Sequence, residues 1–202
     1  MLKLLKIAIT GGVASGKTSV CKFFQELGAF VVDTDKITHE ILAPDSNLGK
    51  KIIQEFGSEV LKNGIFDRQI IAKKVFENSK LLQFLEELVH PAVFCRVKEF
   101  YTEACKKNKY TFFVVEVPLL FEIQGESFYD YVVTVIADET LSRERFQKKG
   151  FLNIEYDRRM KRQLSPNQKA KKSNYIFKNN GSLAELQKQV IALNQILQQS
   201  KE

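Results

Sequence analysis

The sequence predicts a three-layer α/β fold in which helices cover both faces of a parallel sheet of about five strands. Short apolar runs alternate with segments whose apolar residues recur at helical spacing. The longer runs are apolar throughout, as expected for parallel strands that are buried on both faces. The expected strands cover residues 4–9, 30–32, 111–115, 131–136 and 175–177.

Helices are expected after most of these strands. The first of these helices is indicated by the helical spacing of Val20, Phe23, Phe24 and Leu27, and Gly28 marks its end. Further helices are expected over 138–149, around 154–164, and over 183–197 at the end of the chain. The alternation of strand and helix favours one domain, built on a core of residues 1–45, 108–140 and 173–202.

Residues 47–107 break the alternation, because they show a helical pattern and no strand signal. Asp67 is a suitable helix cap, and Pro91 is expected to begin a further helix. The block is too long for one crossover connection. We therefore expect residues 46–107 to form a helical cap over the carboxyl edge of the sheet, where ligands bind in such folds.

Composition narrows the class of protein. Apolar residues make up 44% of the chain, and no run is long enough to span a membrane. The first strand begins at once, which leaves no room for a signal peptide, and the three cysteines lack metal-ligand spacing. We expect a cytoplasmic protein with reduced thiols. No surface stripe marks an interface, so a monomer or weak homo-oligomer is expected.

The net charge of +7 is unevenly distributed. Residues 141–178 hold 12 Lys/Arg and 3 Asp/Glu, a balance of +9, so the remainder carries −2. This concentration favours a basic lid, residues 141–172, over a polyphosphate rather than a basic face along nucleic acid. A solvated basic helix without such a role is the plain alternative. We expect no nucleic-acid partner.

The most specific motif is the segment 11–18, called the phosphate loop below, which matches G-x-x-x-x-G-K-[ST]. It follows a predicted strand and precedes a predicted helix, which is the setting that a phosphate-binding loop requires. The alternative is a glycine-rich turn with an exposed lysine. Glycines let successive N–H groups point at an anion, and the helix N-terminus adds positive charge.

These residue types assign individual roles. Lys17 is expected to reach the β- and γ-phosphates of ATP, and the Thr18 hydroxyl to hold Mg²⁺. The predicted nucleotide-binding residues of this segment are Gly12, Val13, Ala14, Ser15, Gly16, Lys17, Thr18 and Ser19.

Carboxylates follow two of the predicted strands. Asp33 and Asp35 lie two residues apart, and either could accept the proton of an attacking hydroxyl or simply cap a helix. Glu116 follows the third strand, where it could orient Mg²⁺ or face solvent. No N-K-x-D motif of nucleotide switch proteins is present. A small-molecule kinase is therefore favoured.

Nearly the whole chain resembles the dephospho-CoA kinase family, within the nucleoside monophosphate kinase-like group. The resemblance extends beyond the phosphate loop to motifs in a fixed order. They are T-G-G-x-x-x-G-K-T at 10–18, D-x-D-x-x-x-H at 33–39, F-G at 56–57, Gly64, D-R at 67–68, V-F at 75–76, H-P at 90–91, P-L-L-F-E at 118–122 and N-N-G-S at 179–182.

The resemblance implies transfer of the γ-phosphoryl group of ATP to the ribose 3′-hydroxyl of dephospho-CoA, the last step of coenzyme A synthesis. It implies Asp35 as the base, with Lys17 and Arg145 as further catalytic residues, and Arg145, Asn179 and Gly181 at the nucleotide. The implied substrate contacts are Asp33, Asp35, His39, Arg68, His90, Leu120, Glu122 and Arg159, although either histidine could be structural. Another small-molecule or nucleoside monophosphate kinase, or a nucleotide-gated RNA- or partner-binding protein, remains the alternative.

Two segments depart from the family pattern. Lys149 stands where an arginine is usual, and lysine lacks the planar fork that binds phosphate through two parallel hydrogen bonds. Ser173-Asn174 stands where Ala-Asp is usual.

Overall fold

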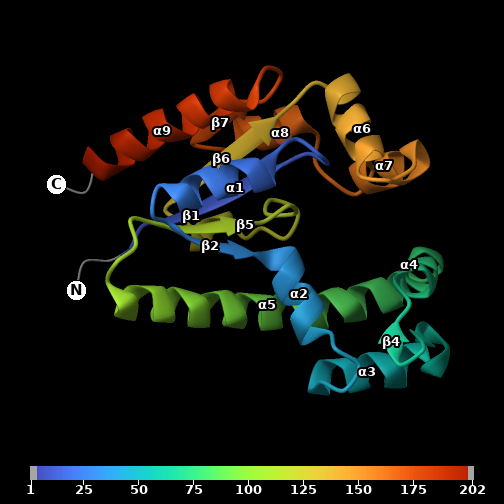
Figure 1. Ribbon diagram of the computed structural model, residues 1–202. Coiled ribbons are helices and arrows are strands. Elements are labelled where there is room, and N and C mark those ends of the chain that lie inside the picture. Colours follow the sequence, from blue (N-terminus) through green and yellow to red (C-terminus); the bar gives the residue numbers. More distant parts are fainter. Residues whose placement is uncertain (1–3, 200–202) are drawn as a thin grey trace. The chain divides into compact units, whose positions relative to one another are not determined.

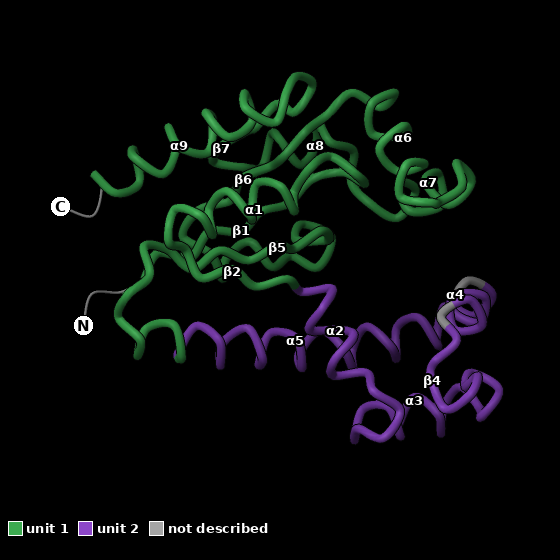
Figure 2. Tube along the Cα trace, viewed as in Figure 1, with its two compact units in different colours: residues 1–33, 103–202 green, residues 34–102 purple. Residues whose placement is uncertain are grey.

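The computed structural model describes residues 4–199, except the side chains of Arg68 and Phe76. It divides the chain into two compact units (Figure 2). Unit 1 comprises residues 1–33 and 103–202, and unit 2 comprises residues 34–102. The helical unit thus begins at Thr34, whereas the sequence placed the start of a cap at residue 46.

Unit 1 is built on a five-stranded sheet with the order β2-β5-β1-β6-β7, and every neighbouring pair is parallel (Figure 1). This confirms the predicted α/β fold with a parallel sheet. Strand β1 is central, and the loop that follows it therefore opens at the carboxyl edge between neighbouring strands. The strands are β1 Lys6–Gly11, β2 Phe30–Asp33, β5 Phe113–Glu116, β6 Tyr131–Ile136 and β7 Tyr175–Lys178.

Helices α1 (Lys17–Glu26) and α9 (Leu183–Gln199) pack together against one face of this sheet (Figure 1). The apolar stripe of α9 supplies Leu186, Val190, Leu193 and Leu197 to a core cluster that also contains Val133 and Val135 of β6. Thr134 alternates with those valines and therefore points to the opposite face. Helix α8 (Pro166–Lys171) contacts β6 and β1.

Helix α8 was not predicted, because it is short and rich in lysine. It does carry a start signal, since Ser165 and Gln168 form a reciprocal capping box ahead of Pro166. The other elements of unit 1 are α6 (Glu139–Lys148), α7 (Asn153–Met160) and a 3₁₀ turn at Glu126–Phe128.

Unit 2 contains four helices and a small hairpin among its described residues. They are α2 (Thr34–Ile41), α3 (Asn47–Phe56), a 3₁₀ turn at Ser58–Val60, β3 (Leu61–Lys62), β4 (Ile65–Phe66), α4 (Arg68–Glu77) and α5 (Ser79–Lys107), the last of which ends in unit 1. Ile52, Phe56, Val60 and Val75 form its buried core. As expected, Asp67 caps α4, because its carboxylate accepts the N–H groups of Gln69 and Ile70.

Two expectations for this region are wrong. The segment is not free of strands, because β3 and β4 pair as an antiparallel hairpin. Its turn residues, Asn63 (φ 53°) and Gly64 (φ 75°), are both left-handed, as a two-residue hairpin turn of type I′ requires. Asn-Gly was a hairpin signal that the surrounding helical pattern concealed.

The second error concerns Pro91, which lies inside α5 and does not begin a new helix. Proline removes one helical hydrogen bond. The neighbouring turns still bury apolar side chains, among them Val89 and Val97 at 9% exposure each. Packing of the helix on both sides of Pro91 offsets the lost bond.

Candidate active site

The phosphate loop joins the end of β1 to the start of α1. Its backbone is left-handed at Ala14 (φ 53°) and at Gly16 (φ 106°), a conformation that turns successive N–H groups into a concave surface. Glycine is required at position 16 for a second reason besides its left-handed backbone. A Cβ atom on Gly16 would overlap the side-chain amide of Asn179. The loop is therefore wrapped closely around that asparagine.

Asn179 holds three parts of unit 1 together. Its side chain is 3% exposed, and Nδ2 donates to the carbonyl oxygen of Ser15 over 2.7 Å. Its backbone N–H donates to Ile136 at the end of β6, and its carbonyl oxygen accepts Nη1 of Arg145 over 2.9 Å. Two residues expected at the nucleotide, Arg145 and Asn179, thus meet directly beside the phosphate loop.

Gly181 follows in the same connection. A Cβ atom there would overlap the carboxylate of Glu185, which accepts the N–H of Ser182 over 3.0 Å and so shapes the start of α9. The missing side chain at Gly181 allows this close approach.

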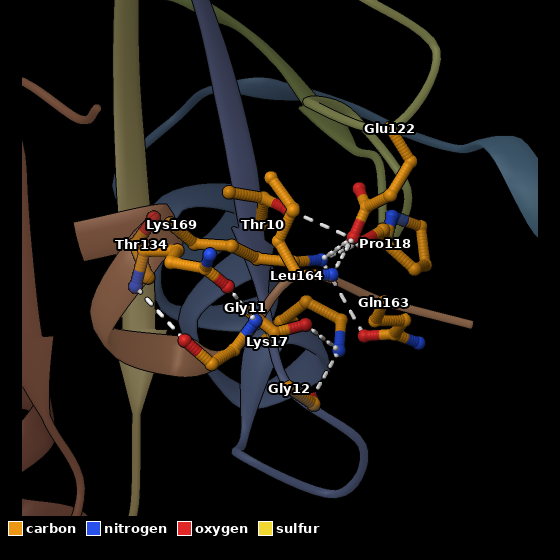
Figure 3. Close-up of polar contacts among 12 residues, drawn as sticks. Thr10, Gly11, Gly12, Lys17, Pro118, Glu122, Thr134, Gln163, Leu164 and Lys169 are labelled. Carbon is orange, nitrogen blue, oxygen red and sulfur yellow. Dashed lines mark hydrogen bonds and ion pairs between the residues drawn. The ribbon is translucent and has the colours of Figure 1, made fainter. Parts of the chain in front are cut away.

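Lys17 folds back over the phosphate loop instead of extending into solvent. Its side chain is 8% exposed, and Nζ donates to the carbonyl oxygens of Gly12 over 2.8 Å and Gly11 over 3.2 Å (Figure 3). An exposed lysine was the alternative interpretation of the motif, and this burial excludes it. The ammonium group is held over the loop, where it can neutralise a bound phosphate.

Oxygen ligands suited to a divalent cation gather beside the first turn of α1. The Thr18 hydroxyl lies 3.2 Å from Oε1 of Glu116, which is 8% exposed. Asp33 is the register partner of Glu116 across the β2–β5 ladder. Hard oxygen donors of this kind fit Mg²⁺. Glu116 is therefore not a carboxylate that faces solvent.

Cys21 lies next to this carboxylate pair. Burial raises the pKa of its thiol well above the usual range, and the negative charges of Glu116 and Asp33 raise it further. Cys21 is thus a protonated, uncharged neighbour of the two carboxylates.

The lid contains helices α6, α7 and α8, and its arginines have different partners. Arg143 pairs with Glu139 and Asp157, both at 2.6 Å. The guanidinium of Arg159 lies 5.2 Å from the ring of Phe146 and 5.0 Å from that of Phe151, a stacked pair. Lys149 is exposed at the end of α6.

A cavity of about 260 Å³ lies between the phosphate loop and the lid. Gly12, Val13 and Ser15 line one side, and residues of β6, α6, α7 and α8 line the others, among them Ser142, Tyr156, Met160 and Pro166. Within unit 1 the lid therefore approaches the phosphate loop without filling the space beside it.

The P-L-L-F-E segment, residues 118–122, contacts both the interior of unit 1 and the lid. Leu120, an expected substrate contact, is fully buried in this structure, at 0% exposure. Oε1 of Glu122 accepts the N–H of Leu164 over 2.7 Å and lies 3.0 Å from Nζ of Lys169. Glu122 therefore binds the lid.

From the sequence, Lys169 is only one of the 12 basic residues between 141 and 178, with no individual role. Its side chain is fully buried, at 0% exposure, and Nζ donates to the carbonyl oxygen of Pro118 over 2.6 Å (Figure 3). Burial lowers the pKa of Lys169, and the Glu122 carboxylate opposes that shift. Glu122 in the P-L-L-F-E motif was the available signal, because a buried carboxylate requires a cation from another part of the chain.

The remaining expected substrate residues lie in unit 2. Asp35 is exposed in the first turn of α2, and His39 is exposed in its last turn. His90 is half-buried in α5. Arg68 is the first residue of α4, and its side chain lies outside the described part of the chain.

At Ser173-Asn174 the structure explains the serine and not the asparagine. Oδ1 of Asn174 accepts the N–H of Val132 over 2.8 Å, an interaction that an aspartate oxygen could equally make. Ser173 Oγ lies 2.5 Å from the hydroxyl of Thr134, which is fully buried. Ser173 thus satisfies a threonine within the sheet.

A parallel sheet with this strand order, a phosphate loop after its central strand and a basic lid define a P-loop kinase. Relatives specify the kind of kinase. The family model for dephospho-CoA kinase matches residues 5–185, and the chain belongs to the dephospho-CoA kinase family. Its members are ATP-dependent phosphotransferases.

Individual relatives match over nearly their whole length. The dephospho-CoA kinase of Protochlamydia amoebophila is 42% identical over 98% of both chains. That of Chlamydia pneumoniae is 44% identical over 94% of this chain and 95% of its own. The solved dephospho-CoA kinase of Campylobacter jejuni is 27% identical, covers 98% of both chains and superposes with a TM-score of 0.71.

Hydropathy gives one further result. Within residues 4–199, no helix combines the length and apolar character needed to cross a bilayer.

Proposed function

We propose that the protein transfers the γ-phosphoryl group of ATP to the ribose 3′-hydroxyl of dephospho-CoA and so forms coenzyme A. The observation that carries this proposal is the position of Lys17, which is buried and tied to the carbonyl oxygens of Gly11 and Gly12 above a loop of inward N–H groups. The family membership specifies the acceptor.

In this mechanism the phosphate loop binds the triphosphate of ATP. The backbone N–H groups from Ala14 to Ser19 donate to the β- and γ-phosphate oxygens, and Lys17 neutralises their charge. Asn179 supports the loop through Ser15, and Arg145 lies against the Asn179 carbonyl oxygen, beside the nucleotide.

Thr18 and Glu116 are the residues that would hold Mg²⁺, with Asp33 next to them in register. Mg²⁺ supplies neutralisation of the phosphate charge when it is bound. No group of three or more His, Cys, Asp or Glu side chains suited to a metal gathers among residues 4–199. Water and phosphate oxygens would therefore complete the coordination shell, which is common for Mg²⁺.

Asp35 is proposed as the base. Its carboxylate would accept the proton of the 3′-hydroxyl as that oxygen bonds to the γ-phosphorus, while the bond from the γ-phosphorus to the bridging oxygen of ADP breaks. His39, His90, Arg68 and Asp33 are proposed contacts of the acceptor. Arg159 of the lid would approach its phosphate groups after leaving the rings of Phe146 and Phe151.

The proposed organisation is one kinase domain with a core, a helical substrate cap and a basic lid. In such a domain, closure of the lid would exclude water that could otherwise hydrolyse ATP. We further propose a cytoplasmic location and a monomeric or weakly associating protein.

The test is incubation of the purified protein with ATP, Mg²⁺ and dephospho-CoA, followed by mass analysis of the acceptor. We expect coenzyme A as the product. Asp35→Asn should reduce turnover by about 100-fold or more with nearly unchanged ATP affinity. Lys17→Ala should weaken both ATP affinity and turnover. Phosphorylation of nucleoside monophosphates or shikimate in preference to dephospho-CoA would refute the proposed acceptor.

A further inference from the structure

The carbonyl oxygen of Pro118 is a junction of three segments of unit 1. It accepts the hydroxyl of Thr10 over 3.3 Å and the ammonium group of Lys169 over 2.6 Å (Figure 3). Thr10 immediately precedes the phosphate loop, Pro118 lies two residues after Glu116, and Lys169 belongs to α8. One oxygen atom thus joins the strand before the loop, the segment after the metal-site carboxylate and the lid.

Among the described residues, Nζ of Lys169 has three polar partners. Besides Pro118, Nζ contacts Oε1 of Glu122 at 3.0 Å and Oε1 of Gln163 at 3.4 Å. Two of these three partners belong to the segment 118–122. The side chain is fully buried, so it cannot contact ATP or the acceptor directly. Any influence on the reaction must pass through the groups it holds.

Burying the ammonium group of Lys169 costs desolvation free energy, so an ion pair is an unfavourable way to attach α8 to the segment 118–122. Desolvation of a charged pair offsets much of its attraction, and apolar residues of similar volume often stabilise a fold equally well. The geometry offers a reason beyond stability, because Lys169 holds a backbone carbonyl two residues from Glu116. An apolar side chain could fill the space but could not hold that oxygen.

We infer that Lys169 is a positioning residue for phosphoryl transfer, which fixes the Pro118 carbonyl so that the Glu116 carboxylate stays beside Thr18. The inference rests on the proposed role of Thr18 and Glu116 toward Mg²⁺. Residues that orient metal ligands from behind typically contribute about 10- to 100-fold to metal affinity or activity.

The experiment compares Lys169→Met with the double variant Lys169→Met/Glu122→Gln. In the single variant a buried carboxylate loses its counter-charge, and we expect a lower unfolding temperature. The double variant removes that charge while the amide oxygen introduced at position 122 can still accept the N–H of Leu164, so we expect its unfolding temperature to recover. Lys171→Met is the matched control, since Lys171 is an exposed residue of the same helix.

The decisive measurement is ADP affinity by calorimetry with and without Mg²⁺. We expect the gain in affinity from Mg²⁺ to be about tenfold smaller in the double variant than in the wild type and the control. Turnover of dephospho-CoA should fall by a similar factor. A double variant with wild-type Mg²⁺ dependence would overturn the inference and leave Lys169 as a counter-charge for Glu122 alone.

This readout separates the two proposals. ADP binding requires no acceptor, so it tests the role of Lys169 even if the wild-type protein phosphorylates another alcohol. Failure of the wild type to convert dephospho-CoA would count against the proposed function and not against the positioning role.

Discussion

The Thr18 hydroxyl donates a 3.2 Å hydrogen bond to Glu116, a residue 98 positions away in the sequence. This contact joins the first turn of α1 to the end of β5. Glu116 is 8% exposed, so its carboxylate lies largely out of solvent beside this turn.

Glu116→Gln should weaken the dependence on Mg²⁺. The amide keeps the size of the side chain and can still accept from Thr18, but it removes the negative charge. We expect the Mg²⁺ concentration for half-maximal activity to rise by about 10-fold or more. Titration of Mg²⁺ at fixed ATP measures the effect. Glu144→Gln on the exposed face of α6 is the control, and equal curves for the two variants would refute the role.

Asn179→Ala should weaken ATP binding without unfolding the protein. It removes the bond to the Ser15 carbonyl and the surface on which Gly16 packs. Loss of about 1–2 kcal/mol corresponds to a roughly 5- to 30-fold higher Kd for ATP. Calorimetry with ATP checks this value. Gln195→Ala, on the exposed face of α9, is the control and should change ATP affinity little.

Thr134 and Ser173 should be energetically coupled. Ser173→Ala leaves the buried Thr134 hydroxyl without this partner and should cost about 1–2 kcal/mol of unfolding free energy. Adding Thr134→Val should recover much of that loss, because no hydroxyl then remains to be satisfied. Urea unfolding of both single variants and the double variant gives the coupling energy, and strictly additive losses would contradict it.

Cys21 should resist alkylation while Cys95 reacts. Cys95 is exposed, whereas Cys21 is buried and keeps its proton because desolvation and two nearby carboxylates raise its pKa. Peptide mapping after treatment with iodoacetamide at about pH 8 distinguishes the two sites. Rapid modification of Cys21 in the folded protein would contradict the assigned burial.

The raised pKa of the Cys21 thiol also predicts that the stability of the fold depends on pH. In the unfolded chain the Cys21 thiol loses its proton near pH 8.5, whereas the folded protein retains it. The folded state then holds more protons, so stability falls as the pH rises above about 8.5, by up to about 1.4 kcal/mol per pH unit. Cys21→Ala should lack this part of the decline in urea unfolding between about pH 7.5 and pH 9.5.

Local patterns were sufficient for the sheet and the phosphate loop. Each strand has its own apolar run, and G-x-x-x-x-G-K-T lies in the strand–loop–helix setting that gives it meaning. The β3–β4 hairpin was missed because two-residue strands are too short to show alternation, although Asn63-Gly64 marked the turn.

The contacts that support the site could not be predicted from local sequence patterns. The pairs Ser15–Asn179 and Glu122–Lys169 depend on which segments the fold brings together, and sequence spacing carries no signal for that. Lys169 looked like its exposed neighbours in the lid, since burial of a charged residue depends on tertiary packing and not on composition.

The bond between Ser15 and Asn179 spans 164 positions of the chain. During synthesis, the phosphate loop would leave the ribosome long before the asparagine against which it packs. The growing polypeptide would consequently bind nucleotide only weakly until most of its C-terminal third had emerged. Competence to bind ATP would thus appear late in the maturation of each new molecule.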